Sequence, residues 1–152
     1  MEIRLGDFED RRVVELLREH LAGMHASSPP GSVYALDLSG LQHPLVSFYT
    51  VWDGDDLLGC GALKHVDRDT AELKSMRTTA RHLRRGAGAF MLDHLLRLAR
   101  ARNYARVCLE TGSGAAFEAA LALYRKHGFT PCAAFGDYVA SEFNQFLQLA
   151  LR

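Results

Sequence analysis

A basic turn that contains two glycines offers the clearest chemical signal in the sequence. The segment Leu83-Arg84-Arg85-Gly86-Ala87-Gly88 follows a predicted strand at Ala71–Thr78 and opens a long amphipathic helix that ends near Arg102. The start of a helix exposes unpaired backbone N–H groups and the positive end of its dipole, and glycine lets an anion approach the backbone closely. Together with Arg81, the turn predicts a phosphate or pyrophosphate site.

The charge distribution supports a local anionic ligand. The chain carries 18 basic and 18 acidic residues, yet the stretch from Lys74 to Arg106 holds nine Lys and Arg and a single acid, Asp93. The rest of the chain is therefore acidic. Nucleic acid would favour a broader basic surface with stacking aromatics, which the sequence lacks, so we expect no nucleic-acid partner.

Two common phosphate loops do not fit this turn. A P-loop requires Lys followed by Ser or Thr after its last glycine, and no such pair follows Gly88. A dinucleotide-binding fingerprint requires Gly or Ala at the position of Met91, and normally follows the first strand of the chain. A nucleotide-binding module of another kind stays open as an alternative.

Length and composition indicate one domain over residues 1–152, with 48% hydrophobic and 24% charged residues. No apolar run approaches the roughly 20 residues of a membrane span, and the N-terminus does not resemble a signal peptide. Cys60, Cys108 and Cys132 are widely spaced, which favours free thiols over disulfides or a metal site. We therefore expect a cytoplasmic protein without membrane contact or bound metal.

Hydrophobic periodicity predicts seven strands and four helical segments. The predicted strands are Met1–Leu5, Val46–Trp52, Leu57–Val66, Ala71–Thr78, Arg106–Thr111, Phe129–Ala134 and Asn144–Leu151. The predicted helices are Phe8–Ala26 with Asp7 as its N-cap, a short turn within Tyr34–Leu41, the helix after Gly88, and Ala115–His127. This order predicts an α/β (α+β) fold, in which a mixed sheet carries helices on both faces.

Two motifs together resemble the Gcn5-related N-acetyltransferase (GNAT) superfamily. Residues 83–88 stand where the family has Gln/Arg-x-x-Gly-x-Gly/Ala, with Leu83 as the departure, and Ala119–Phe129 is similar to its A-x-x-L-Y-x-x-x-G-F helix. The segments Glu72–Arg77 and Leu109–Gly112 resemble small bacterial members. The resemblance implies a mostly antiparallel sheet of about seven strands, whose central parallel strands splay apart to admit an acyl-CoA thioester.

The resemblance also implies roles for individual residues. The end of the fourth strand would bind pantetheine, through Met76, Arg77 and Thr78. The loop amides would hold the pyrophosphate of acetyl-CoA, at Leu83, Arg84, Arg85, Gly86, Ala87, Gly88 and Ala89. Tyr124 matches the tyrosine that bonds the CoA sulfur and acts as general acid on the departing thiolate.

The acceptor side lacks an equally clear motif. A primary amine with a pKa of about 10.4 must lose a proton before it attacks a thioester. Glu72 and Glu110 are the leading candidates for the catalytic base, although Glu72 could simply pair with Lys74 on the same strand face. We expect His65, Tyr138 and Asn144 to line the acceptor site. Three histidines are weaker alternatives for the base: His65, His20 and His25.

The sequence thus predicts an acyltransferase that moves an acetyl group from acetyl-CoA to a primary amine of a small molecule, by direct attack in a ternary complex. A non-catalytic acyl-CoA-binding sensor and a protein lysine or N-terminal acetyltransferase remain alternatives, because residues 26–41 carry no readable motif. The apolar last strand, Phe146–Leu151, would also allow a strand-mediated homodimer.

Overall fold

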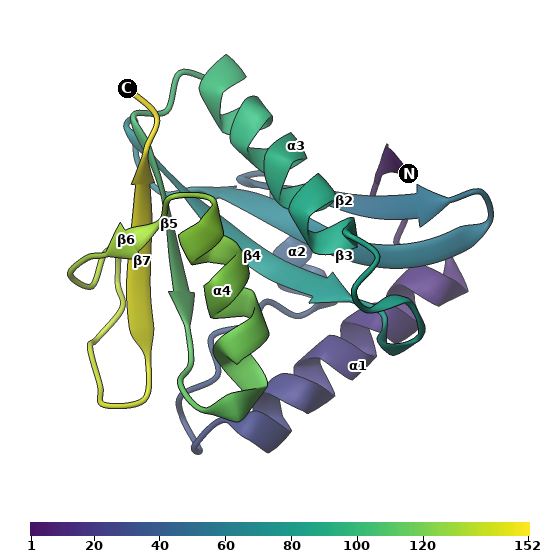
Figure 1. Ribbon diagram of the computed structural model, residues 1–152, viewed down its shortest axis with the longest axis horizontal. Helices are drawn as coiled ribbons and strands as arrows, with labels where there is room; N and C mark the ends of the chain where they lie inside the picture. Colours follow the sequence, from purple (N-terminus) through teal and green to yellow (C-terminus); the bar gives the residue numbers. More distant parts are fainter.

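Seven strands form one sheet in the order β1–β2–β3–β4–β5–β7–β6 in the computed structural model, which describes residues 1–152 (Figure 1). The strands are β1 (Glu2–Leu5), β2 (Val46–Asp53), β3 (Asp56–His65), β4 (Thr70–Thr78), β5 (Arg106–Thr111), β6 (Thr130–Pro131) and β7 (Gln145–Ala150). Every neighbouring pair is antiparallel except β4 and β5, which are parallel. The predicted mixed, mostly antiparallel sheet is therefore confirmed.

The parallel strands β4 and β5 are paired over only part of their length. Their register runs from Thr70 opposite Arg106 to Glu72 opposite Cys108 and then stops, although β4 continues to Thr78. Figure 1 shows the two strands diverging towards their carboxyl ends. This is the predicted splay, and it leaves the second half of β4 without a partner on one edge.

Helices cover both faces of the sheet. They are α1 (Arg11–Ser27), α2 (Leu38–Leu41), α3 (Ala87–Ala101) and α4 (Glu118–Lys126). One apolar cluster joins α1 and α2 to Phe48, Trp52 and Ala62, and a larger one joins α3 and α4 to Leu58, Leu63 and Val107. Because side chains alternate along a strand, these clusters lie on opposite faces. No helix combines the length and apolar character that crossing a membrane requires.

The start of the first helix differs from the prediction. Asp10, not Asp7, is the N-cap of α1, and its carboxylate accepts a hydrogen bond from the Arg12 N–H at 2.9 Å. Asp7 instead closes a turn by accepting from the Glu9 N–H at 2.9 Å. An Asp followed by another Asp three residues later offers two equivalent caps, and the sequence pattern selected the wrong one.

The short second helix and the C-terminal elements are also shorter than predicted. Only Leu38–Leu41 of the expected 34–41 segment is helical, and the predicted helix 115–127 divides into a 3₁₀ turn at Ala115–Phe117 and α4. The predicted strand 129–134 reduces to Thr130–Pro131, since proline has no N–H to continue a ladder. The last strand, β7, lies between β5 and the two-residue β6, which pairs only with Leu147 and Gln148. The strand-mediated dimer stays a prediction.

Candidate acyl-CoA site and acceptor cavity

The loop before α3 forms a cradle of free backbone N–H groups. None of the N–H groups from Leu83 to Ala89 donates a hydrogen bond, and the first bond of the helix runs from the Phe90 N–H to the Gly86 carbonyl at 3.0 Å. Gly86 is the N-cap in a left-handed conformation (φ 83°) without a side-chain cap, and Arg84 is also left-handed (φ 65°). Free donors at the positive end of a 15-residue helix suit a pyrophosphate.

Close packing fixes this cradle beside the splay. A Cβ added to Gly88 would lie 3.3 Å from Leu123 of α4 and 3.8 Å from the Thr78 hydroxyl at the end of β4. Ala87 is buried in the core that α3 and α4 share. The cradle therefore sits where β4 ends and the two helices meet, next to the unpaired half of that strand.

The arginines of the loop differ in how their charge is used. Arg85 pairs with Asp53 of β2 at 2.7 Å and also bonds the His82 ring at 2.8 Å. Arg81 and Arg84 are exposed and make no ion pair, so their charge is free for an anion. Leu83, the departure from the family motif, is 59% exposed, and it supplies a backbone N–H like its neighbours.

Arg77, at the end of β4, turns its side chain towards α1 rather than towards the loop. Its guanidinium lies 3.3 Å from the position of a Cβ on Gly23. It also faces His20, whose pKa falls to about 4 because burial and then Arg77 disfavour the imidazolium. His20, a weaker candidate for the base, is therefore a buried ring that is neutral at pH 7.

A β-bulge interrupts β4 opposite Gly61. Cys60 faces Arg77 and Ala62 faces Lys74, so Ser75 and Met76 together oppose one residue of β3. Ser75 is left-handed (φ 55°), and its carbonyl accepts from the Cys60 thiol at 3.2 Å. Bulges of this kind redirect a strand and leave ladder groups without a regular partner. The bulge lies in the half of β4 that β5 does not cover.

Glu72, Lys74 and Tyr138 form a buried network at the base of the splay. The Lys74 ammonium lies 3.3 Å from the Glu72 carboxylate and donates to the Tyr138 hydroxyl at 2.7 Å. The Tyr138 hydroxyl also donates to Glu72. Glu72 is only 3% exposed. The network ties the 135–138 loop to β4, and it engages the Glu72 carboxylate twice.

Glu110 has a different environment. It is half-buried on β5 beyond the last pair with β4, opposite Phe146 of β7, and it makes no hydrogen bond or ion pair. Burial raises its pKa to about 7, against a smaller lowering by Lys74 and with a further rise from Glu72. Glu110 is thus a carboxyl group that gains or loses its proton near neutral pH.

Tyr124 lies in α4 with its ring buried against Phe129, at 5.8 Å between ring centroids. Burial raises the pKa of its phenol, and no hydrogen bond within the protein engages the hydroxyl. The group is therefore protonated at neutral pH and free to donate.

A cavity lies beside the Glu72 network. It has a volume of about 660 Å³ and is lined by Tyr34, Leu36, Leu45, Lys64, His65, Val66, Glu72, Lys74, Phe135, Gly136, Asp137 and Tyr138. It brings together His65, Tyr138 and Glu72 from the predicted site. His65 bonds the Tyr104 hydroxyl at 2.6 Å. The volume is that of a small-molecule site.

Asn144 does not line this cavity. Its side-chain oxygen accepts from the Ser141 N–H at 2.7 Å, and its amide donates to the Val139 carbonyl at 3.1 Å. These bonds shape the loop that precedes β7. Asn144 is therefore not in a position to contact a ligand in this cavity, and its predicted role at the acceptor site stays a prediction.

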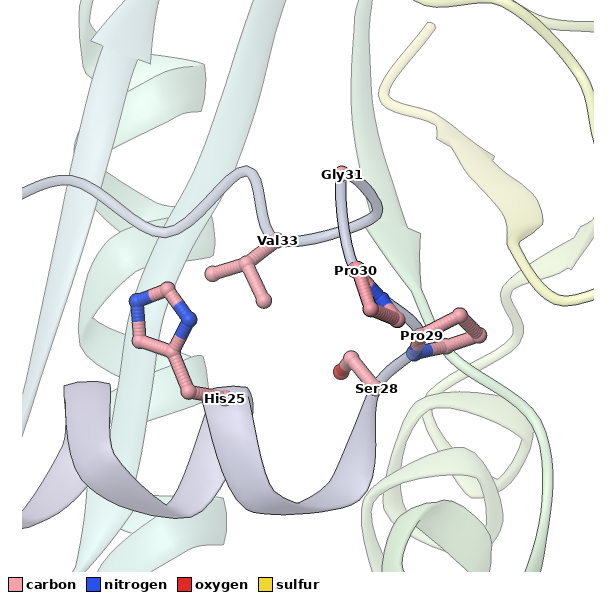
Figure 2. Close-up of a pocket in the computed structure, with 6 residues that line it drawn as sticks. All are labelled: His25, Ser28, Pro29, Pro30, Gly31 and Val33. Atoms are coloured by element: carbon pink, nitrogen blue, oxygen red, sulfur yellow. The ribbon is translucent and has the colours of Figure 1, made fainter.

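A smaller cavity of about 330 Å³ lies at the end of α1. Figure 2 shows the His25 ring projecting from the helix beside Val33 and Pro30 of the following loop. No sequence pattern predicted that residues 26–41 contribute to the cavity linings. Tyr34 and Leu36, for example, lie in an irregular loop without periodicity. Phe135 also lies in a loop, whereas Lys64 lies on β3 and reaches the cavity through the register of the sheet, which no local pattern specifies. The structure contains no cluster of three or more His, Cys, Asp or Glu side chains suited to a metal ion.

Known proteins with similar sequences or folds agree with this geometry. The acetyltransferase (GNAT) family matches residues 12–129. The chain is 48% identical to the uncharacterized N-acetyltransferase YsnE of Bacillus subtilis (strain 168), over 91% of each chain. A candidate acyl-CoA N-acyltransferase from Klebsiella pneumoniae superposes with a TM-score of 0.82 at 25% identity, over 99% of this chain and 97% of the other. A Bacillus subtilis acetyltransferase in complex with CoA superposes at 0.74, with 20% identity over 99% of each chain.

Gly86→Ala should weaken binding of acetyl-CoA about tenfold. A left-handed Ala is strained by about 1 kcal/mol or more, so the cradle would relax away from its binding shape. A tenfold change in Kd corresponds to about 1.4 kcal/mol of binding free energy. Gly54→Ala is the matched control, since Gly54 also has a positive φ (59°) and open space around its Cα, but lies in the β2–β3 turn. Isothermal titration gives both affinities. Equal affinities for the two variants would contradict the role of the cradle.

Proposed function

This chain belongs to the acetyltransferase (GNAT) family, as its two motifs predicted, and we propose that its acetyl acceptor is a primary amine of a small molecule. The observation that carries the proposal is Glu110, an unpaired carboxyl with a pKa of about 7 on the open side of the splay. It lies within electrostatic reach of Lys74 and Glu72, which line the 660 Å³ cavity. A base of that pKa is suited to take a proton from an ammonium group at neutral pH.

The donor side follows the chain from β4 into α3. The unpaired stretch Met76–Thr78 would bond the pantetheine as an added strand would, since β5 leaves this edge of β4 free. The free amides from Leu83 to Ala89 would hold the pyrophosphate, with Arg81 and Arg84 adding charge. The pantetheine segment leads along the chain into the pyrophosphate loop. Acetyl-CoA bound along both would therefore place its thioester in the splay near Met76.

Glu110 rather than Glu72 is the better base. Glu72 is nearly inaccessible and already receives hydrogen bonds from both Lys74 and Tyr138. Removing it from that network to accept a further proton would leave a buried ammonium without its partner, which is costly. Glu110 has no such partner. We therefore assign Glu72 a positioning role and Glu110 the proton-accepting role, directly or through one water.

The transfer conserves atoms and charge. Glu110 takes one proton from the ammonium group, and the free amine nitrogen forms a bond to the thioester carbonyl carbon. As the carbon–sulfur bond breaks, the nitrogen loses a second proton, which ends on the CoA sulfur, and Glu110 then returns its own proton to solvent. A backbone N–H near Met76, at the bulge, would stabilise the oxyanion. Tyr124 donates a hydrogen bond to the departing sulfur. Since a thiol has a pKa of about 8.5, below that of a buried phenol, this bond stabilises the thiolate before it is protonated.

Two further candidates differ in what they release. A sensor would bind acetyl-CoA but would release no free thiol with any amine, whereas the enzyme would release one thiol for each amide formed. A protein acetyltransferase would turn over peptides better than free amines. The cavity favours the small molecule, because it is lined from five separate segments instead of forming a groove along one strand edge.

Glu110→Gln should lower kcat by about 10²–10⁴, the range for loss of a general base. Wild-type kcat should fall as pH drops through about 7, because Glu110 works only when deprotonated, and this limb should be absent in the variant. Glu118→Gln, an exposed substitution on α4, is the control. Thiol release at saturating acetyl-CoA across pH 5.5–9 provides the data. An unchanged limb near 7 in Glu110→Gln would exclude this residue as the base.

Tyr124→Phe should lower kcat more than it lowers affinity for acetyl-CoA, because the hydroxyl acts on sulfur as it departs. Tyr49→Phe removes a hydroxyl from β2, outside the splay, and should leave both quantities unchanged. Stopped-flow thiol detection and equilibrium binding separate the two effects. If kcat stays at the wild-type value in Tyr124→Phe, the hydroxyl has no part in the chemical step.

A further inference from the structure

Lys64 is the one lysine in the acceptor cavity that has no counter-charge. Lys74 is held by Glu72 and Tyr138, but Lys64 makes no ion pair and no hydrogen bond through its side chain. It is half-buried on β3, and its backbone is the direct cross-strand partner of Glu72. A cation in this position raises the local concentration of anions, and it would gain a charge-assisted bond from a carboxylate.

The other charges of the cavity do not cancel this one. The Glu72 charge is balanced by Lys74 at 3.3 Å. Asp137 also lines the cavity, but it is exposed on the 135–138 loop, where solvent screens its field. Lys64 therefore remains the uncompensated charge on the sheet side of the cavity.

Aromatic and aliphatic side chains make up much of the rest of the cavity lining. Tyr34 and Leu45 are 36% and 48% exposed, and they stand with Leu36, Val66 and Phe135 around the cavity. Tyr138 contacts Tyr34 and Phe135 edge to face, both at 5.2 Å between centroids. Exposed aromatic and aliphatic groups beside a polar floor suit a ligand with an apolar body.

The spacing allows one small molecule to reach both Lys64 and Glu110. Both residues project from the same face of the sheet, because Lys64 and Cys108 are each paired with Glu72 in register and Glu110 follows Cys108 by two residues. Strand spacing and rise place their Cα atoms about 12 Å apart. Glu110 is not among the residues that line the cavity, so the amine would extend from the cavity towards β5. Lys64 and Glu110 side chains that lean towards each other would leave between their charged ends the length of one α-amino acid, with a hydrogen bond of about 2.8 Å at each end.

We propose that the acceptor is an amino acid with an apolar or aromatic side chain, whose carboxylate binds Lys64 while its amine faces Glu110. This inference rests on the proposed function and names the substrate class of the same site. Lys64 is then a specificity-determining residue. It selects for the carboxylate and takes no part in proton transfer.

The test compares amino acids with the amines that lack only the carboxylate. Tryptophan, phenylalanine and leucine should show kcat/KM at least tenfold above tryptamine, phenethylamine and isoamylamine, the effect of one charge-assisted bond. Lys64→Met should remove this preference, because kcat/KM for the three amino acids should fall to the level of the corresponding amines. Lys64→Arg should retain most of it, and Lys126→Met, on the exposed end of α4, should retain all of it.

The outcomes separate this inference from the proposed function. Equal kcat/KM for the two series in the wild-type enzyme, or a preference that persists in Lys64→Met, would overturn the amino-acid assignment while leaving a small-molecule amine acetyltransferase intact. A higher rate with aspartate than with tryptophan would overturn its apolar part. Absence of thiol release with every compound, while acetyl-CoA still binds, would overturn the proposed function itself.

Discussion

The loss of pairing between β4 and β5 after Glu72 and Cys108 is the constraint on which the rest of the site depends. Two parallel strands that stayed paired would fill the centre of the sheet with hydrogen bonds and leave no room for a ligand. Once they part, the end of β4 presents free edge groups, and the bulge at Ser75 lies in that free half. The helix that follows, α3, begins at this point and turns its free N–H groups to the same place. In the proposed function, this one interruption would align the sites for pantetheine and pyrophosphate along a single stretch of chain.

The same opening creates the electrostatic contrast between two glutamates. Glu72 lies where the strands are still paired, and it is neutralised there by Lys74 and bonded by Tyr138, which anchors the 135–138 loop over the cavity. Glu110 lies just beyond the last pair, half-buried and without a partner, so its carboxyl is the one that titrates near neutral pH. We therefore propose that position relative to the splay gives Glu72 a structural role and Glu110 the role in proton transfer.

Much of the donor half was predictable because it is encoded locally. The strand, the glycine turn and the amphipathic helix are contiguous. Hydrophobic periodicity predicted the order of the helices and strands along the chain. The acceptor half is assembled from distant segments, with Tyr34 in an irregular loop, Lys64 on β3 and Phe135 after β6. Their meeting depends on sheet register and loop path, which no local pattern specifies. Two predictions of element boundaries were wrong. Asp10 rather than Asp7 caps α1, and the predicted strand 129–134 shortens to Thr130–Pro131. Tertiary contacts decide between competing caps and decide where a strand that contains proline ends.

The central claim is that the splay gives Glu110 the proton affinity of a general base at neutral pH. Carbon-13 NMR of the glutamate carboxyls, with the resonance assigned by its loss in Glu110→Gln, measures this directly in the protein without ligands. The account predicts a titration midpoint at about 7 for Glu110. A midpoint near the ordinary glutamate pKa of about 4.3 would contradict it, because a carboxylate with that pKa is too weak a base to accept a proton from the amine efficiently at neutral pH.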